Sequence, residues 1–245
     1  MSALLELEGV TAGYAADIDV LRGVSIAAEA GRITGLIGLN GAGKSTLMKT
    51  ICGFLRPSAG EVRYDGASIS GMAPHRLIDR GICYIPQESS LFPYMSVEEN
   101  LRLPLERLAR GKGARADTQA RMDGMLRHFP LLAQKLRAQA GDLSGGQQKM
   151  LEFGKAYVLR PRLCLVDEPS IGLAPKLAAE VYGWIDLFTE QGMTILLVDH
   201  NVRRVVKLAH YVYVLSLGQI TAQGRPEDFA GDLHEQVKSW LGVNF

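Results

Sequence analysis

The sequence predicts an α/β fold with a mixed or parallel sheet core and an inserted α-helical subdomain. Three observations carry this prediction. Roughly the first 85 residues contain short apolar runs separated by glycine and proline turns, a pattern typical of strands. From Val97 to roughly Leu136 the apolar spacing becomes helical. From Arg162 onward strand and helix patterns alternate, which indicates a parallel sheet completed after an insertion.

Each expected element of the core follows from a local pattern. The expected strands in the first part are Leu4 to Glu8, Ile33 to Ile37, Glu61 to Tyr64 and Ile82 to Ile85. Residues 45–55 have helical spacing, and the turn from Pro57 to Gly60 is expected to end that helix. Asp65 and Gly66 mark a turn. The apolar run Leu163 to Val166 indicates a central strand that is buried on both faces.

The inserted region is expected to start with a capped helix. Ser96 and Glu99 stand at capping-box spacing, so each can satisfy an orphan amide at the helix start. Residues 111–114 are expected to form a loop. We therefore expect one domain over residues 1–245, in which 1–87 and 161–245 form the core, with an antiparallel N-terminal part, and 88–160 form the helical subdomain.

Charge and cysteine content narrow the function classes. The chain has 27 Lys and Arg against 26 Asp and Glu, a balance that argues against non-specific nucleic-acid binding. We interpret Cys52, Cys83 and Cys164, which form no Cys-x-x-Cys pair, as apolar core residues in a reducing compartment rather than ligands.

No apolar stretch reaches the roughly 18 residues of a membrane span, and the acidic start is unlike a signal peptide. We expect a cytoplasmic chain whose membrane role comes through a partner.

A phosphate-binding loop is the first motif that carries chemistry. Gly38 to Ser45 fit G-x-x-x-x-G-K-[ST] between an apolar strand and a helix. Glycines let backbone N–H groups surround an anion, and the helix start adds positive potential. Lys44 would neutralise the terminal phosphates, and the Ser45 hydroxyl would bind Mg²⁺. The residues expected to bind the nucleotide here are Asn40, Gly41, Ala42, Gly43, Lys44, Ser45 and Thr46. The alternative is a glycine-rich turn without a ligand.

Two acids end the strand that starts at Leu163. Asp167 and Glu168 stand where open α/β sheets place their ligands. Adjacent strand residues point to opposite sides, so we assign the two acids different roles. Asp167 would join the Mg²⁺ shell through water, and Glu168 would accept the proton of the attacking water. An ordinary acidic turn before Pro169 is the alternative.

Two further polar residues follow strand ends. His200 comes after the run Ile195 to Val198, and its imidazole would touch the γ-phosphate or hold the water and Glu168 in place. A lone histidine is also often structural. Gln87 ends the segment that starts at Ile82. Its amide oxygen would ligate Mg²⁺ or water and report the nucleotide state to the helical region.

The pentapeptide Leu143 to Gln147, with sequence Leu-Ser-Gly-Gly-Gln, stands between the phosphate-binding loop and the acidic strand end. This pentapeptide, the phosphate-binding loop, the acidic strand end, Gln87 and His200 stand in the order and at the spacing of one protein family. Over essentially its whole length, the chain resembles the ATP-binding subunits of ATP-binding-cassette (ABC) transporters. The resemblance implies a P-loop NTPase fold of the ABC ATPase type, with a RecA-like core, and ATP and Mg²⁺ as ligands.

The resemblance also implies that the pentapeptide serves the ATP of a second subunit. Family members form head-to-tail dimers with two ATP molecules between them, so Ser144, Gly145, Gly146 and Gln147 are expected to bind the ATP of the mate. Ser144 would cap a helix beginning near Gly145 and so provide a second anion-binding helix end. Tyr14 matches the aromatic residue that stacks on adenine in the family. An ordinary surface tyrosine is the alternative.

Two branches of the family share further segments with this chain. Glu168 to Pro175 and Gln87 to Leu101 are similar to branched-chain amino acid importer ATPases, and urea and amide importers share these features. Asp199 to Arg203 and the ending Leu241 to Phe245 are instead similar to lipopolysaccharide-export ATPases, which act as homodimers. Most family members carry an aspartate where this chain has Ala174, which puts communication between the two ATP sites in doubt.

The resemblance implies ATP-driven import of branched-chain amino acids or related amides. The expected partners are a second ABC ATPase subunit, homologous or identical, two transmembrane permease subunits and, indirectly, a periplasmic substrate-binding protein, but no nucleic acid. The expected location is the cytoplasmic face of the bacterial inner membrane. Candidates for the permease-docking surface, or else for buried core, are Leu91, Phe92, Pro93 and Tyr94. Outside transport, the alternatives are a soluble cassette ATPase working on ribosomes or chromosomes and a nucleotide-binding regulator without turnover.

Overall fold

The computed structural model describes residues 3–15, 18–106 and 114–229 of the chain. The chain divides into two compact units: the first comprises Met1–Tyr84, Arg162–Glu168 and Asp186–Phe245, and the second comprises Ile85–Pro161 and Pro169–Ile185. The second unit therefore includes residues 169–185, which the sequence places in the core. A single ABC ATP-binding domain over both units stays a prediction.

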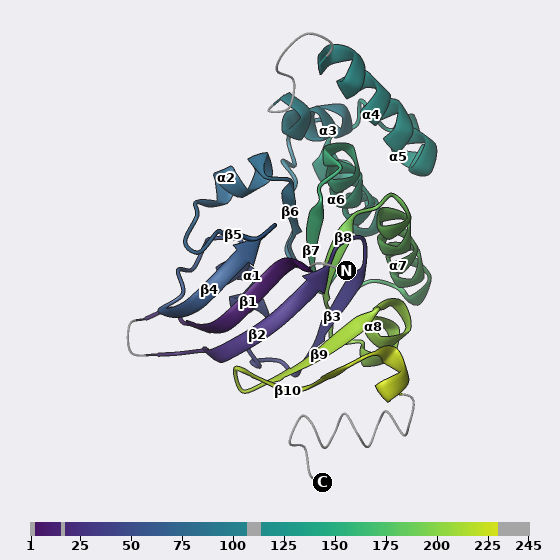
Figure 1. The fold of residues 1–245 in the computed structure, drawn as a ribbon. Coiled ribbons are helices and arrows are strands. Elements are labelled where there is room, and N and C mark those ends of the chain that lie inside the picture. Colours follow the sequence, from purple (N-terminus) through teal and green to yellow (C-terminus); the bar gives the residue numbers. More distant parts are fainter. Residues whose placement is uncertain (1–2, 16–17, 107–113, 230–245) are drawn as a thin grey trace. The chain divides into compact units, whose positions relative to one another are not determined.

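An antiparallel sheet forms the N-terminal part of the first unit (Figure 1). Its strands lie in the order β2 (Leu21–Glu29), β1 (Ala3–Ala12), β4 (Ala59–Tyr64) and β5 (Ala67–Ser68). β1 pairs antiparallel with both β2 and β4. The predicted turn between β4 and β5 is present, with φ of 52° at Asp65 and 74° at Gly66.

A six-stranded mixed sheet carries the strand ends that matter for function. The order is β10 (Gln219–Gly224), β9 (Tyr211–Ser216), β3 (Ile33–Ile37), β8 (Thr194–Val198), β7 (Leu163–Asp167) and β6 (Ile82–Ile85). β3 runs parallel to β8 and β9, β7 runs parallel to β8, and β10 is antiparallel to β9. Every residue of β3, β7 and β8 is buried. The predicted α/β fold with a mixed sheet is confirmed.

The carboxyl ends of the central strands meet at one edge of this sheet. Leu36 of β3 and Asp167 of β7 both pair with Val198 of β8. The loops that leave β3, β7 and β8 therefore start side by side, as open α/β sheets require for a ligand site.

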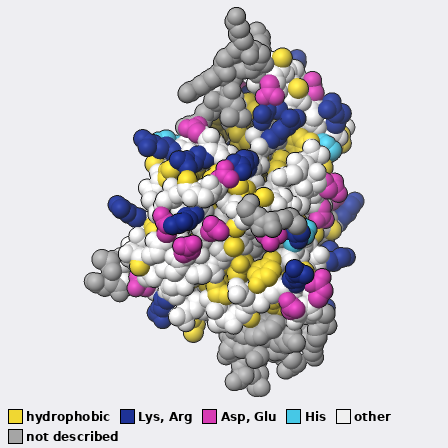
Figure 2. All heavy atoms as spheres, in the orientation of Figure 1, with side chains coloured by type: hydrophobic (Ala, Val, Ile, Leu, Met, Phe, Trp, Pro, Cys, Tyr) yellow, Lys and Arg dark blue, Asp and Glu magenta, His cyan; other side chains and the backbone are white. Residues whose placement is uncertain are grey.

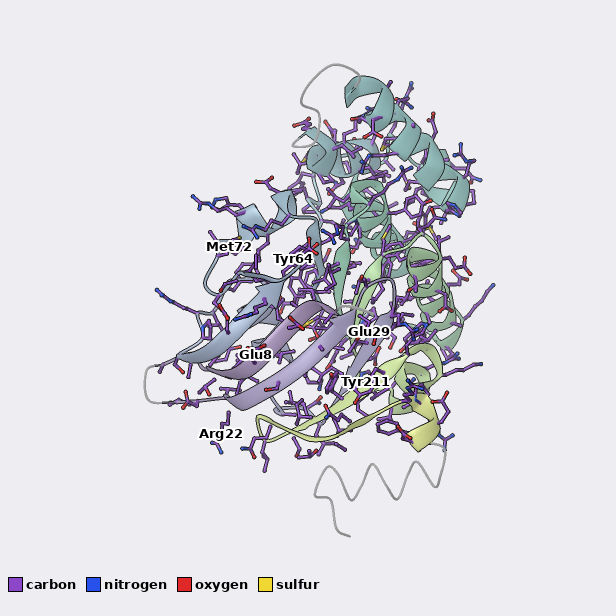
Figure 3. All side chains as sticks on the ribbon, in the orientation of Figure 1. Glu8, Arg22, Glu29, Tyr64, Met72 and Tyr211 are labelled. Carbon is purple, nitrogen blue, oxygen red and sulfur yellow. The ribbon has the colours of Figure 1, made fainter. Side chains whose placement is uncertain are left out.

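Among the described residues, three α-helices lie wholly within the first unit: α1 (Lys44–Ile51), α2 (Pro74–Asp79) and α8 (Val202–Leu208). The sequence predicts that the first of these continues to Leu55, and this is wrong. Gly53 ends it with φ of 73°, and a Cβ there would stand 1.9 Å from the Met72 carbonyl oxygen. The side chains of both sheets and α1 share one hydrophobic core, which Met72 and Tyr211 flank in Figure 3.

The second unit is helical. It contains α3 (Val97–Glu106), α4 (Ala114–His128), α5 (Pro130–Gln134), a 3₁₀ turn (Ala140–Asp142), α6 (Gly145–Leu159) and the first part of α7 (Pro175–Glu190). The predicted capping box is present, because the Ser96 N–H donates to Glu99 at 2.7 Å and the Glu99 N–H donates to Ser96 Oγ at 3.2 Å. Of the predicted loop over residues 111–114, residues 111–113 lie outside the described residues, and Ala114 begins α4.

Aromatic packing explains why α7 contributes to the second unit. The Trp184 ring lies 5.6 Å from the ring of Phe129 and 5.3 Å from that of Phe153, measured between centroids. Phe129 and Phe153 are fully buried. The middle of α7 thus packs on side chains of α6 and the α4–α5 junction, which local periodicity does not reveal.

The three cysteines are free thiols, with Cys52 and Cys164 buried and Cys83 half-buried. A hydrogen bond with Cys83 and burial raise the pKa of Cys164, and burial raises that of Cys52. Among the described residues, no helix has both the length and the apolar character needed to cross a bilayer.

Candidate active site

The phosphate-binding loop connects β3 to α1. Gly41 and Gly43 have φ of 81° and 109°, which L side chains rarely adopt. Gly38 has a different constraint, because a Cβ there would stand 2.4 Å from the Leu215 carbonyl oxygen. The N-cap residue of α1 is Gly43, which has no side chain that could cap the helix start. The loop therefore presents an anion-binding helix start without an internal anion at its cap.

The structure brings the predicted nucleotide-binding residues of this segment together. Ala42, Gly43, Lys44 and Thr46 are buried, whereas Asn40, Gly41 and Ser45 are exposed. Lys44 is the buried cation of the group, only 4% exposed. Its ammonium donates to the Gly38 carbonyl at 2.9 Å and to the Leu39 carbonyl at 3.1 Å, so the side chain folds back over the loop.

Glu168 supplies the negative charge beside this lysine. Its Oε1 lies 3.3 Å from Lys44 Nζ, and the residue is 8% exposed. The sequence analysis assumes that Asp167 and Glu168 are adjacent residues of one strand. This assumption is wrong for Glu168. β7 ends at Asp167, and Glu168 adopts a φ of 43° while its N–H donates to the Val198 carbonyl at 2.8 Å. A left-handed turn, rather than strand alternation, separates the two carboxylates.

Asp167 presents an unsatisfied oxygen at the same strand end. Its Oδ2 accepts a hydrogen bond from the Tyr84 hydroxyl at 3.0 Å. Its Oδ1 is buried and has no hydrogen-bond partner among the described residues. Burial raises the pKa of Asp167, and the Tyr84 hydrogen bond opposes this shift. A buried carboxylate oxygen without a partner, next to the loop that carries the Ser45 hydroxyl, fits an Mg²⁺ ion or one of its waters.

His200 lies beyond the end of β8, with half of its side chain exposed. Its Nδ1 is 3.3 Å from Asp199 Oδ1 and 3.9 Å from Glu168 Oε2. Asp199 is fully buried and also accepts the Asn201 N–H at 2.9 Å, which fixes the carboxylate. The histidine is thus held from one side and directed at Glu168. Sequence reasoning missed the supporting roles of Tyr84 and Asp199, because only strand pairing and the turn after β8 reveal them.

Tyr14 lies at the start of α1. Its hydroxyl is 3.5 Å from Thr46 Oγ1 and 3.4 Å from Lys49 Nζ, and the Lys49 ammonium lies 5.2 Å from the ring centre. The residue is 59% exposed, so its ring is accessible to a base beside the phosphate-binding loop. Adenine stacking on Tyr14 stays a prediction.

The pentapeptide and Gln87 belong to the second unit. Gln87 is exposed there, and Ser144 is the N-cap of α6, with its N–H donating to Gln147 Oε1 at 3.2 Å. A Cβ on Gly146 would stand 2.3 Å from Leu177 Cδ2, whereas a Cβ on Gly145 would meet no other described residue within 4 Å, its chain neighbours and nearby helix backbone apart. Within the described residues, a side chain at position 146 would thus require Leu177 to move, whereas one at position 145 would not displace a neighbour.

We expect Lys44→Ala to weaken ATP binding by about 10-fold or more, because a charge-assisted contact contributes roughly 1.5–3 kcal/mol. Calorimetric titration of the full chain with ATP measures this. Lys207→Ala removes an exposed lysine of the same unit and serves as the control. Equal affinities of Lys44→Ala and the unaltered chain would rule out the phosphate-binding role of Lys44.

Comparisons with known proteins agree with this geometry. The family description "ABC transporter" matches residues 21–171. The high-affinity branched-chain amino acid transport ATP-binding protein BraG of Pseudomonas aeruginosa is 37% identical over 84% of this chain and 87% of its own length. The lipopolysaccharide export system ATP-binding protein LptB of Escherichia coli is 32% identical over 92% of both chains.

Solved structures show the same fold. An ATP-binding cassette of an ABC transporter, MJ1267, superposes with a TM-score of 0.84 at 30% identity and covers 98% of this chain and 99% of its own. The matched family segment includes the phosphate-binding loop, the pentapeptide and the acidic end of β7. The chain therefore belongs to the ABC transporter family, as one of its ATP-binding subunits.

Proposed function

We propose that this chain hydrolyses ATP and thereby powers transport through membrane subunits. The observation that carries the proposal is the position of Glu168, whose carboxylate lies 3.3 Å from the Lys44 ammonium and 3.9 Å from His200 Nδ1. A carboxylate in this place can accept the proton of a water that attacks the phosphate bound by Lys44. A regulator without turnover would not need this arrangement.

The remaining residues of the site hold the reacting groups. Lys44 and the loop N–H groups bind the terminal phosphates, and His200, fixed by Asp199, orients the water and Glu168. Asp167 Oδ1 and the Ser45 hydroxyl would hold Mg²⁺, to which Gln87 would add an amide oxygen. Mg²⁺, when bound, neutralises charge on the β- and γ-phosphates.

The proposed hydrolytic site is completed by a second subunit. A Cβ at position 145 would meet none of the neighbouring described residues, so the start of α6 is open to a ligand that approaches from outside. A phosphate of the ATP held by the partner fits, because helix N-termini bind anions and Ser144 to Gln147 surround this one. Two-fold symmetry would then give two equivalent composite sites. Ala174 is exposed and offers no side-chain hydrogen bond across such a seam.

The loop after Gln87 is the proposed docking surface for the permease subunits. The side chains of Phe92 and Tyr94 are 49% and 89% exposed, Pro93 is exposed and Leu91 is half-buried. Phe92, Pro93 and Tyr94 are therefore not buried core, whereas Leu91 is only partly accessible. Two exposed aromatic rings on one loop are typical of a protein–protein contact.

The proposed cargo is a branched-chain amino acid or a related amide. The similarity to BraG supports import, and we infer a homologous or identical second cassette, two permease subunits, a periplasmic binding protein and a place on the cytoplasmic face of the inner membrane. The similarity to LptB favours lipopolysaccharide export as the second candidate. Of the two segments behind that candidate, Leu241 to Phe245 lie outside the described residues. Figure 2 shows Lys and Arg mixed with Asp and Glu on the face in view, which supports partners other than nucleic acid.

We expect Glu168→Gln to bind ATP but to hydrolyse it at least about 10²-fold more slowly, which is typical for the loss of a general base. Phosphate release by the purified chain measures the rate. Glu8→Gln, an exposed position on β1, is the matched control. Turnover near that of the control would remove Glu168 from the proposed role.

A second prediction concerns Gly145. In a Glu168→Gln chain, ATP is expected to produce a dimer, which sedimentation or light scattering detects. Adding Gly145→Ala is expected to prevent this dimer while monomer stability and ATP affinity stay unchanged, because a methyl group here meets only what approaches from outside. Gly183→Ala, an exposed and equally open position on α7, is the control. Normal dimer formation by the chain with Gly145→Ala would refute the composite site.

A further inference from the structure

Glu152 is a buried carboxylate that hydrolysis does not use. It lies on α6 and is 4% exposed. Its Oε1 accepts the Ser90 N–H at 2.9 Å, and its Oε2 lies 2.7 Å from Lys149 Nζ. Burying a carboxylate is unfavourable unless it is paired and hydrogen-bonded, and an apolar side chain would pack at this place with less penalty. The contact to Ser90 therefore calls for a functional reason.

Lys155, one turn further along α6, binds the carbonyl of Ser90, the residue whose N–H binds Glu152. Its ammonium donates to the Ser90 carbonyl at 2.8 Å and lies 5.6 Å from the centre of the Phe92 ring. Both backbone groups of Ser90 are thus bonded to charged side chains of one helix. Such charge-assisted hydrogen bonds are stronger and more directional than neutral ones.

The rest of this loop is fixed by its backbone. The buried Asn100 side chain accepts the Phe92 N–H at 2.9 Å and donates to the Phe92 carbonyl at 3.0 Å. The Gly141 N–H donates to the Pro93 carbonyl at 2.8 Å. The aromatic side chains nevertheless stay exposed, so this framework holds a rigid surface for a partner rather than packing the rings inside.

We propose that Glu152 and Lys155 are positioning residues that fasten the loop of residues 90–94 to α6, so that the exposed aromatic residues move with the Ser144 end of this helix. α6 is continuous from Gly145 to Leu159. Glu152 stands about two turns, or about 10 Å, from its start, a distance over which a helix moves as one body.

This proposal rests on the proposed function. There, Ser144 meets the ATP of the partner subunit, and the loop meets a membrane subunit. Closure at the pentapeptide is then transmitted to the docking surface through two side chains, Glu152 and Lys155. No flexible element is needed between the pentapeptide and the docking surface, because all of these contacts lie within the second unit.

Amide hydrogen exchange of the full chain tests the fastening without nucleotide. We expect Glu152→Met to raise the exchange rate of the Ser90 amide by about 10-fold or more, since the amide loses a charged acceptor. Lys155→Met should raise the exchange of residues 90–94 in the same direction. Ser90→Ala is the control, because both contacts use the Ser90 backbone. Should Glu152→Met destabilise the whole chain, Glu152→Gln keeps an acceptor oxygen and is expected to preserve Ser90 protection. Unchanged Ser90 exchange in folded Glu152→Met would overturn the proposal.

The second arm tests transmission, with ATP as the probe in a Glu168→Gln chain. ATP is expected to produce a dimer and to change exchange over residues 90–94. With Glu152→Met or Lys155→Met the dimer should still form but the change should vanish, whereas Ser90→Ala should retain it. A merely structural role would lower stability without abolishing this response, and a response that persists in Glu152→Met overturns the proposal. A chain that stays monomeric with ATP instead refutes the proposed function, and with it the transmission.

Discussion

A buried ammonium next to a carboxylate organises the candidate active site. Lys44 is nearly inaccessible to solvent, and its charge is balanced by two loop carbonyls and by Glu168 at 3.3 Å. Without an anion, a cation at this depth would be strongly destabilising. In the proposed function the loop binds the phosphates of ATP, so Glu168 and the terminal phosphate would compete for one lysine. In the proposed function, binding of ATP would release Glu168 to act on water.

The sheet explains why this competition is possible. Pairing of Leu36 and Asp167 with Val198 aligns the ends of β3, β7 and β8, and the left-handed turn at Glu168 directs its carboxylate towards Lys44 instead of along the strand. A non-glycine residue in that conformation costs about 1–3 kcal/mol, which the neighbouring contacts must offset. Asp167 remains in the strand with an unsatisfied oxygen. In the proposed site, one strand end would thus provide both a proton acceptor and a ligand for the metal.

Local sequence patterns predict much of this arrangement. The bounds of β3 and β6 and the capped start of α3 follow from apolar runs, glycine and proline turns and capping residues, which act over a few positions. The end of α1 is not predictable in this way, because a tertiary contact between Gly53 and Met72 decides it. The turn at Glu168, the support of Asp167 by Tyr84 and the fastening of Ser90 by Glu152 also depend on residues distant in the chain. Sequence motifs identify the candidate reacting groups. The residues that orient these groups can be identified only from the packing in the structure.

The most direct measurement is the affinity of a monomeric chain for a non-hydrolysable ATP analogue. The chain that retains Glu168 is compared with the chain that carries Glu168→Gln. Both chains carry Ser144→Arg, which is expected to prevent pairing, so that only the chain's own phosphate-binding loop is measured. The account predicts tighter binding by Glu168→Gln, because the carboxylate that competes for Lys44 loses its charge. Equal or weaker binding would show that Glu168 is not the anion that the nucleotide displaces.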